Sequence, residues 1–207
     1  MVQYILSAAM GYLLGCKSMA MKVSKRRDTD VRDSGSGNLG ASNVVLLLGW
    51  KAGIVTGLHD IFKAFLAVFL AKLFFPQHAY AGVTAGVSAI YGHIFPAHLG
   101  FRGGKGFACY YGMLVGLNWK FSVFMLLVIL LVVFLTDYIV MGTVSIMVVA
   151  PLYMLLVQKN AVAALLMASV SMVMFWKHQS NFERIRNRQE AGIKATLRGD
   201  YKEYQLK

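Results

Sequence analysis

The run WKFSVFMLLVILLVVFLT (119–136) decides the fold class, because it contains no charged residue after Lys120. An upright helix needs about 20 predominantly apolar residues to cross a bilayer, a length that this run nearly fills. The whole chain has the same character: 57% of its 207 residues are apolar, the mean hydropathy is +0.58, and 14% are charged. A soluble domain of this size could not bury so much apolar surface, so the composition predicts an integral membrane protein.

Working outward from this run, we count seven apolar segments, several of them short for a full span. They cover residues 2–21, 51–75, 79–96, 104–118, 119–136, 138–157 and 160–177. Four segments carry two glycines spaced four residues apart, a pattern that lets helices approach closely in lipid. These pairs are Gly11/Gly15, Gly53/Gly57, Gly82/Gly86 and Gly112/Gly116. We therefore predict an all-α integral membrane protein with about seven transmembrane helices in a tight bundle.

The placement of Lys and Arg predicts the orientation. The net charge of +12 is concentrated in residues 22–33, in the 97–105 turn and after residue 176, whereas the opposite loops hold only Lys120 and Lys159. Basic loops stay in the cytoplasm, so we expect the N-terminus outside. We expect a single domain over residues 1–190 and a basic cytoplasmic tail over 191–207. Basic clusters beside apolar spans favour membrane lipid as a partner and not nucleic acid.

The sequence lacks both the cysteine spacing of a metal site and the N-terminal pattern of a cleaved signal peptide. Cys16 and Cys109 lie in apolar runs without metal-ligand or disulfide spacing, so we expect no metal. No basic stretch precedes the first apolar segment, so we expect it to be a retained helix and not a cleaved signal peptide.

Three segments rich in glycine and basic residues interrupt the apolar pattern, and all fall on the predicted cytoplasmic side. They are GSGNLGASN (35–43), GHIFPAHLGFRGGKG (92–106) and HQSNFERIRNRQE (178–190). Helices embedded in hydrocarbon have no use for such segments. Irregular backbone with free N–H groups beside Lys and Arg suits an anionic group. The three segments therefore suggest a protein that handles phosphate at the bilayer surface.

The first segment offers a phosphate cradle, because glycines adopt backbone conformations closed to other residues and the polar side chains add donors. The candidate groups are Arg32, Gly35, Ser36, Gly37, Asn38 and Ser42. The alternative is a flexible loop rich in turn residues.

The second segment contains GFRGGKG (100–106), which invites comparison with the nucleotide P-loop G-x-x-x-x-G-K-[ST]. The required first glycine is missing, and Gly106 replaces the hydroxyl residue, so we expect no nucleoside triphosphate site. A simpler anion nest remains, with Lys105 as a point charge. Its candidate residues are Arg102, Gly103, Gly104, Lys105 and Gly106.

The third segment spaces His178 and Asn181 three residues apart, so a continued helix would point both the same way. An interfacial histidine at the start of a membrane-surface anchor is the alternative. We interpret Glu190 as structural, paired with a neighbouring arginine.

Two further sites lie inside predicted spans. Asp60 and Lys63 are spaced for an internal ion pair that lowers the cost of charge in the membrane, or they form the wall of a polar cavity. The hydroxyl of Thr143 faces the site or bonds its own helix backbone.

With these residues in place, the chain resembles the PlsY family, the bacterial acyl-phosphate:glycerol-3-phosphate acyltransferases. The match runs in order from GYLLG (11–15) to Glu190, through GSGN-x-GASN, GH-x-FP…GFRGGKG and H-x-x-N…R…E. The resemblance implies a multi-pass enzyme of the bacterial cytoplasmic membrane. It implies transfer of an acyl chain from acyl phosphate to the 1-hydroxyl of glycerol 3-phosphate, with lysophosphatidic acid and inorganic phosphate as products. It implies no metal or other cofactor, and we expect a monomer.

By motif position, the resemblance places the family's site on Ser36, Asn38, Ser42, Lys105, Thr143, His178 and Asn181. We assign catalysis to Ser36, Asn38, His178 and Asn181, and substrate binding to the others. The sequence leaves open whether His178 or a substrate phosphate accepts the proton. Leu46 stands where the family has arginine and Arg188 where it has glycine. Two alternatives remain open: a transporter for a small anion, and a relative with weak or altered activity.

Overall fold

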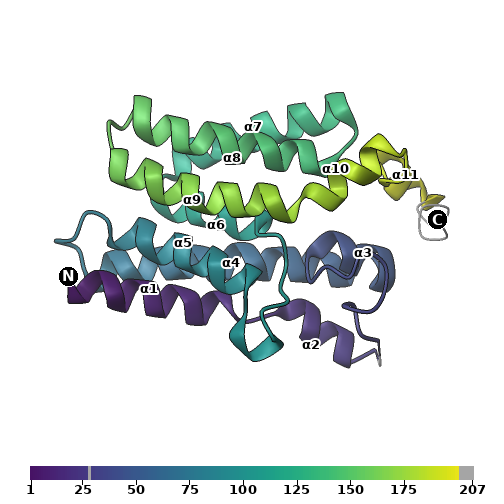
Figure 1. The fold of residues 1–207 in the computed structure, drawn as a ribbon, viewed down its shortest axis with the longest axis horizontal. Coiled ribbons are helices and arrows are strands. Elements are labelled where there is room, and N and C mark those ends of the chain that lie inside the picture. The colour runs from purple at the N-terminus through teal and green to yellow at the C-terminus, as the bar shows by residue number, and fades with distance from the viewer. Residues whose placement is uncertain (28, 201–207) are drawn as a thin grey trace.

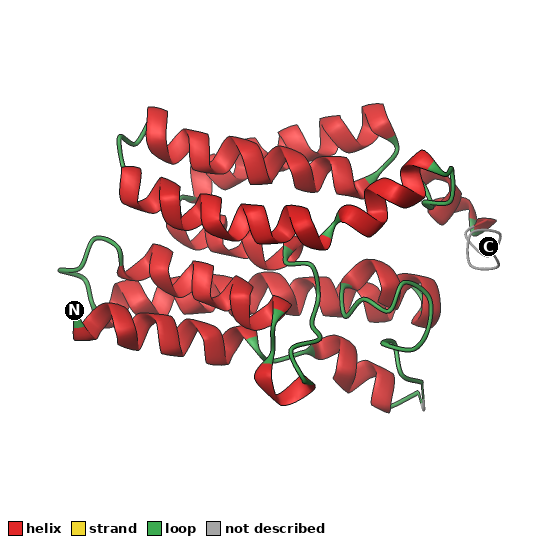
Figure 2. Ribbon diagram, in the orientation of Figure 1, coloured by secondary structure: helices red, strands yellow, loops and turns green. Residues whose placement is uncertain are grey.

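The computed structural model describes residues 1–27 and 29–200, and within them every regular element is helical (Figure 2). The expected all-α class is confirmed. In chain order the elements are α1 (Val2–Gly15), α2 (Met19–Lys25), α3 (Ala41–Leu48), α4 (Trp50–Phe74), α5 (Ala81–Ile94), the 3-10 turn η1 (Ala97–Leu99), α6 (Phe107–Leu117), α7 (Trp119–Thr136), α8 (Ile139–Leu156), α9 (Ala161–Lys177), α10 (Gln179–Arg186) and α11 (Ile193–Arg198).

Each of the seven apolar segments contains one helix of a packed bundle (Figure 1). In the described chain α4, α7 and α8 are long and apolar enough to cross a membrane, and α9 with α10 adds a fourth if this pair, bent by 44°, is one span. Helices α1, α5 and α6 are shorter, with 14, 14 and 11 residues. Helix α1 begins at one end of the bundle and α10 lies at the other, an arrangement compatible with an odd number of passes (Figure 1).

The first apolar segment differs from the expected single helix over residues 2–21, because α1 ends at Gly15. The carbonyl of Lys17 accepts a hydrogen bond of 2.9 Å from the Lys63 ammonium of α4. Ser18 then caps α2, its hydroxyl accepting from the amide of Met21 at 3.3 Å. A break with its own side-chain partners therefore separates an apolar helix from a basic one.

Glycines set the close approach of the helices, as their spacing predicts. A Cβ atom at Gly11 or Gly15 of α1 would overlap the backbone carbonyls of Ala85 and Ala89 on α5. Gly112 of α6 meets the backbone of α4 in the same way. These contacts fix the end of α1 against the end of α5, where the second polar segment begins.

The outer surface of the bundle is apolar. On α7, Leu127 and Phe134 are 62% and 75% exposed. Large apolar side chains at such exposure, on helices of this hydropathy, indicate a face toward lipid.

The residues after 190 begin as a docked helix. The amide of Ile193 donates to the carbonyl of Asp137 at 2.8 Å, and the amide of Lys194 donates to the Asp137 carboxylate at 3.0 Å. Residues 191–200 of the expected tail therefore pack on the turn between α7 and α8, and residues 201–207 lie outside the described residues.

Candidate active site

The second and third polar segments meet through one lysine. Lys105, just before α6, donates from Nζ to Ser180 Oγ at 3.0 Å and to Asn181 Oδ1, both on α10. Asn181 Nδ2 in turn donates to Glu190 Oε1 at 2.6 Å, and Arg184 Nε donates to Glu190 Oε2 at 2.6 Å. We call these five residues the Lys105 network. Sequence reasoning missed Ser180, which carries no signal beyond its place in the segment.

The network leaves the charge of Lys105 without a directly bonded carboxylate. Its two partners are a hydroxyl and an amide oxygen, and no described carboxylate lies within ion-pair distance of it. Burial, followed by repulsion from Arg184, lowers the pKa of Lys105 to about 8, although Glu190 opposes the shift. Lys105 is therefore mostly protonated at pH 7 and presents a positive charge that an incoming phosphate can neutralise.

The amides of Gly103 and Gly104 are already used, which corrects the expected anion nest. Gly103 donates to the carbonyl of Ile94 at 3.1 Å, and Gly104 donates to the carbonyl of His93 at 3.1 Å. A Cβ atom at Gly104 would overlap the His93 ring. These glycines let the loop fold onto the end of α5 and offer no N–H to a ligand.

The free backbone donors lie slightly later in the chain. Among the described residues, the amides of Lys105 and Gly106 have no hydrogen-bond partner. Gly106 caps α6 with a φ of +96°, a conformation that favours glycine. Two unpaired N–H groups, those of Lys105 and Gly106, therefore lie at the N-terminus of α6, where an anion is favoured.

The loop of the first polar segment is shaped by Asn43, a buried residue of α3. Its Oδ1 accepts from the amide of Ser36 at 3.0 Å. Its Nδ2 donates to the carbonyls of Val31 and Ser34 at 2.9 and 3.2 Å. Sequence reasoning gave Asn43 no such organising role, because its partners lie up to twelve positions earlier in the chain.

The rest of this loop matches its expected chemistry. Gly35 and Gly37 have φ values of +60° and +65°, the left-handed region that glycine favours. The side chains of Ser36, Asn38 and Ser42 have no hydrogen-bond partner in the part of the chain that the structure describes. We call residues 34–43 the cradle loop: its backbone is held by Asn43, and its polar side chains are uncommitted.

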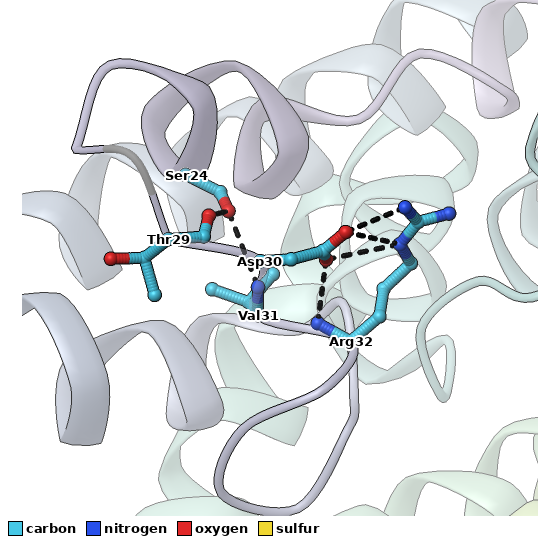
Figure 3. Close-up of polar contacts among 5 residues, drawn as sticks. All are labelled: Ser24, Thr29, Asp30, Val31 and Arg32. Atoms are coloured by element: carbon cyan, nitrogen blue, oxygen red, sulfur yellow. Dashed lines mark hydrogen bonds and ion pairs between the residues drawn. The ribbon is translucent and has the colours of Figure 1, made fainter.

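Arg32 is already paired with an acidic neighbour (Figure 3). It pairs with the Asp30 carboxylate through Nε at 3.0 Å and Nη2 at 2.6 Å. This guanidinium holds the pKa of Asp30 at about 2. The pair uses one edge of the guanidinium, formed by Nε and Nη2, so a substrate phosphate that leaves Asp30 in place has only the edge at Nη1 to bind. Arg102, in contrast, is exposed and forms no ion pair with any described residue.

The expected continuous helix through His178 and Asn181 is wrong, because the chain bends by 44° between α9 and α10. His178 is 5% exposed, and its Nδ1 lies 2.7 Å from the carbonyl of Met174. A carbonyl only accepts, so Nδ1 carries the proton and donates it. Nε2 of the neutral ring is then the atom that can accept a hydrogen bond.

Thr143 follows the alternative expectation. Its buried hydroxyl donates to the carbonyl of Ile139, one turn earlier in α8, at 3.2 Å. No polar contact joins it to the described site residues, so the structure gives it no ligand-binding geometry.

The charges inside the membrane form a buried cluster. Asp60 Oδ1 lies 2.7 Å from Lys63 Nζ, which also lies 2.9 Å from His93 Nδ1. Atoms of Asp60, His93 and Cys109 come within 4.8 Å of one another, a spacing compatible with a metal ion. The Lys63 ammonium already occupies the carboxylate and the ring nitrogen, so these contacts describe the expected internal ion pair.

The three polar segments lie toward the same end of the bundle, opposite the N-terminus (Figure 1). Leu39 of the cradle loop lines a narrow pocket together with Gly103 and Gly104 of the second segment. The second segment reaches the third through Lys105 and Asn181. A polar contact therefore joins the second and third segments, the first borders the second at Leu39, and their convergence on common ligands stays a prediction.

Comparison with known proteins gives a consistent picture. The family model described as glycerol-3-phosphate acyltransferase matches residues 5–188. A glycerol-3-phosphate acyltransferase of Clostridioides difficile is 38% identical, with 92% of this chain and 95% of the relative covered. Glycerol-3-phosphate acyltransferase 1 of Oceanobacillus iheyensis is 33% identical over the same shares of the two chains.

Solved structures resemble the fold over almost its whole length. The crystal structure of PlsY (YgiH), an integral membrane glycerol 3-phosphate acyltransferase in its glycerol 3-phosphate form, superposes with a TM-score of 0.84 at 25% identity. That alignment covers 91% of this chain and 94% of the other. The lysphosphatidic acid form superposes with a TM-score of 0.82 at 24% identity, over 94% and 98% of the two chains.

Proposed function

The chain belongs to the glycerol-3-phosphate acyltransferase family, and we propose that it takes its acyl chain from acyl phosphate. The acceptor is the 1-hydroxyl of glycerol 3-phosphate, and the products are lysophosphatidic acid and inorganic phosphate. The observation that carries this proposal is the Lys105 network, where a half-buried ammonium of the second polar segment is held by neutral groups of the third. A solved relative is described in a lysphosphatidic acid form, which supports the product.

The reaction needs positioned anions more than a covalent nucleophile. The hydroxyl oxygen of glycerol 3-phosphate attacks the acyl carbon, the new C–O ester bond forms, and the bond from that carbon to the phosphate oxygen breaks. The phosphate departs with the bonding electron pair. Because acyl phosphate is already activated, alignment and charge stabilisation supply the acceleration without a cofactor.

We assign glycerol 3-phosphate to the Lys105 network. The Lys105 ammonium and the Asn181 amide bind its phosphate, with Arg102 as an exposed basic group on the same loop. Binding releases Lys105 from Ser180 and Asn181, which then serve as further polar contacts.

We assign the donor phosphate and the developing oxyanion to the cradle loop. Ser36, Asn38 and Ser42 have uncommitted donors there, and the amides of Lys105 and Gly106 add backbone donors at the start of α6. Gly35 and Gly37 contribute the turn that presents these groups.

His178 Nε2 accepts the proton of the attacking hydroxyl, because Nδ1 is already committed to Met174. Substituting His178 with Ala separates this role from positioning. Proton transfer predicts a lower maximal rate, whereas a normal maximal rate with a raised KM for glycerol 3-phosphate contradicts it and leaves the proton to a substrate phosphate.

The cellular setting follows the same proposal. We propose seven spans with an external N-terminus, which would put the site at the cytoplasmic leaflet of a bacterial membrane. The start of α1 and helix α10 lie at opposite ends of the bundle, which supports an odd count. We propose that the enzyme works as a monomer.

The test uses purified full-length protein in lipid vesicles with acyl phosphate and glycerol 3-phosphate. We expect inorganic phosphate and lysophosphatidic acid in equal amounts, and neither product when glycerol 3-phosphate is omitted. Lys120→Ala, a change at an exposed lysine in the first turn of α7, should match the unmodified protein. Phosphate release without lipid product would refute acyl transfer in favour of hydrolysis.

A further inference from the structure

A cavity lies where α1 ends and α2 begins; it borders the second polar segment at Leu99 and shares Lys17 with the narrow pocket at Gly103 and Gly104. Its volume is about 460 Å³, within the range of small-molecule sites. Leu13, Met21 and Leu99 contribute apolar walls, and three lysines, Lys17, Lys22 and Lys25, lie among its lining residues. No carboxylate lines it. The proposed chemistry of acyl transfer uses none of these six residues.

The three lysines are available to a ligand. All are exposed, and none forms an ion pair with a described residue. Lys22 and Lys25 are spaced three residues apart on α2 and so project from one face of that helix. An apolar cavity with three ammonium groups that pair with no described carboxylate is complementary to a molecule with an apolar chain and an anionic head.

The order of apolar and basic residues along α1 indicates how such a molecule would be oriented. Leu13 belongs to the apolar helix and is 66% exposed, and Lys17 follows four residues later, directly after the helix ends. The cavity therefore passes from the hydrocarbon level to the level of the headgroups within about one helical turn. A lipid lying beside α1 would place its acyl chain at Leu13 and its phosphate at the lysines.

We propose that this cavity binds an acidic phospholipid of the surrounding bilayer, with one acyl chain in the cavity and the phosphate on Lys17, Lys22 and Lys25. The bilayer supplies this occupant at high local concentration, and each basic side chain near the surface contributes to its retention. The site rests on membrane insertion and not on acyl transfer, so its failure would leave the proposed reaction untouched.

Native mass spectrometry of the full-length protein tests the site, with phosphatidylglycerol and phosphatidylcholine of identical chains as probes. We expect preferential retention of phosphatidylglycerol. The double substitution Lys22→Gln, Lys25→Gln should weaken that retention about tenfold or more. The matched control is Lys120→Gln, Lys159→Gln, two exposed lysines on other loops, which should behave as the unmodified protein. Equal retention by both double variants would overturn the proposal.

Two further arms separate the lipid from other occupants. Leu13→Trp fills the cavity without changing charge and should also release phosphatidylglycerol, which a purely electrostatic attraction would not show. Inorganic phosphate should fail to displace the lipid, because the acyl chain contributes to its binding. Complete displacement by phosphate at equal concentration would make this a free-phosphate site and contradict the assignment.

Discussion

The Lys105 network and the cradle loop are built in opposite ways. In the network the polar side chains bind one another across α6, α10 and the following turn before any ligand arrives. In the cradle loop one buried side chain, Asn43, holds the backbone, and the side chains assigned to the ligand are left without partners. Substitutions should therefore affect binding and folding together in the network, but separately in the loop.

The largest effect should come from Lys105→Ala. It removes the positive charge assigned to phosphate, so kcat/KM should fall by about 100- to 1,000-fold in the vesicle assay. Lys105→Arg keeps the charge and should retain part of the activity. If Lys105→Ala kept full activity after normal insertion, the network would have no role in binding the reactants.

The next comparison separates two residues of the cradle loop. Ser36→Ala removes an uncommitted hydroxyl, so acyl transfer should fall by roughly 100-fold without a change in stability. Asn43→Ala removes three hydrogen bonds and should lower the free energy of unfolding by about 1–3 kcal/mol as well as the rate. Denaturation in mild detergent measures the difference, and equal stability loss in both variants would break the distinction.

The pH dependence sharpens the role of the network. Lys105 loses its proton above a pKa of about 8, so kcat/KM should decline above that pH, by about tenfold one unit higher. Glu190 raises this pKa, so Glu190→Gln should move the decline to lower pH. In Lys105→Arg the decline should vanish, because arginine stays protonated. A decline that persists in the arginine variant would assign it to another group.

The smallest effect is on stability and concerns Arg188, near the end of the third polar segment. Arg188 has a φ of +56°, which costs a residue with a Cβ about 1 kcal/mol. Arg188→Gly should relieve this strain and raise the free energy of unfolding by about 0.5 kcal/mol, after the extra freedom of glycine in the unfolded chain is subtracted. Arg186→Gly, within α10, should instead destabilise by roughly 0.5–1 kcal/mol. Thermal shifts of opposite sign would confirm the pair.

The backbone conformations of single residues were predictable from the sequence. Which backbone groups bond to distant parts of the fold was not. The positive φ of Gly35 and Gly37 follows from glycine itself, and Arg188 has a positive φ at a position where the resemblance led us to expect glycine. The amides of Gly103 and Gly104, however, were captured by carbonyls of α5. No periodicity in the sequence reveals that folding back of the loop.

Local geometry also changed the picture at two predicted residues. Arg32 pairs with Asp30, two residues away, through one edge of its guanidinium, and its role in substrate binding stays a prediction. The helix at His178 bent, so the spacing of His178 and Asn181 no longer defined one face. Ser180 and Asn43 act through contacts that only the packed structure brings together.

The most direct test measures initial rates of Ser36→Ala and Asn181→Ala while the concentration of each substrate is varied. It asks whether the cradle loop and the Lys105 network bind different reactants. The account predicts that Asn181→Ala raises the KM for glycerol 3-phosphate, whereas Ser36→Ala leaves that KM unchanged and lowers the rate or raises the KM for acyl phosphate. Both variants raising the KM for the same substrate, with the other unaffected, would contradict it.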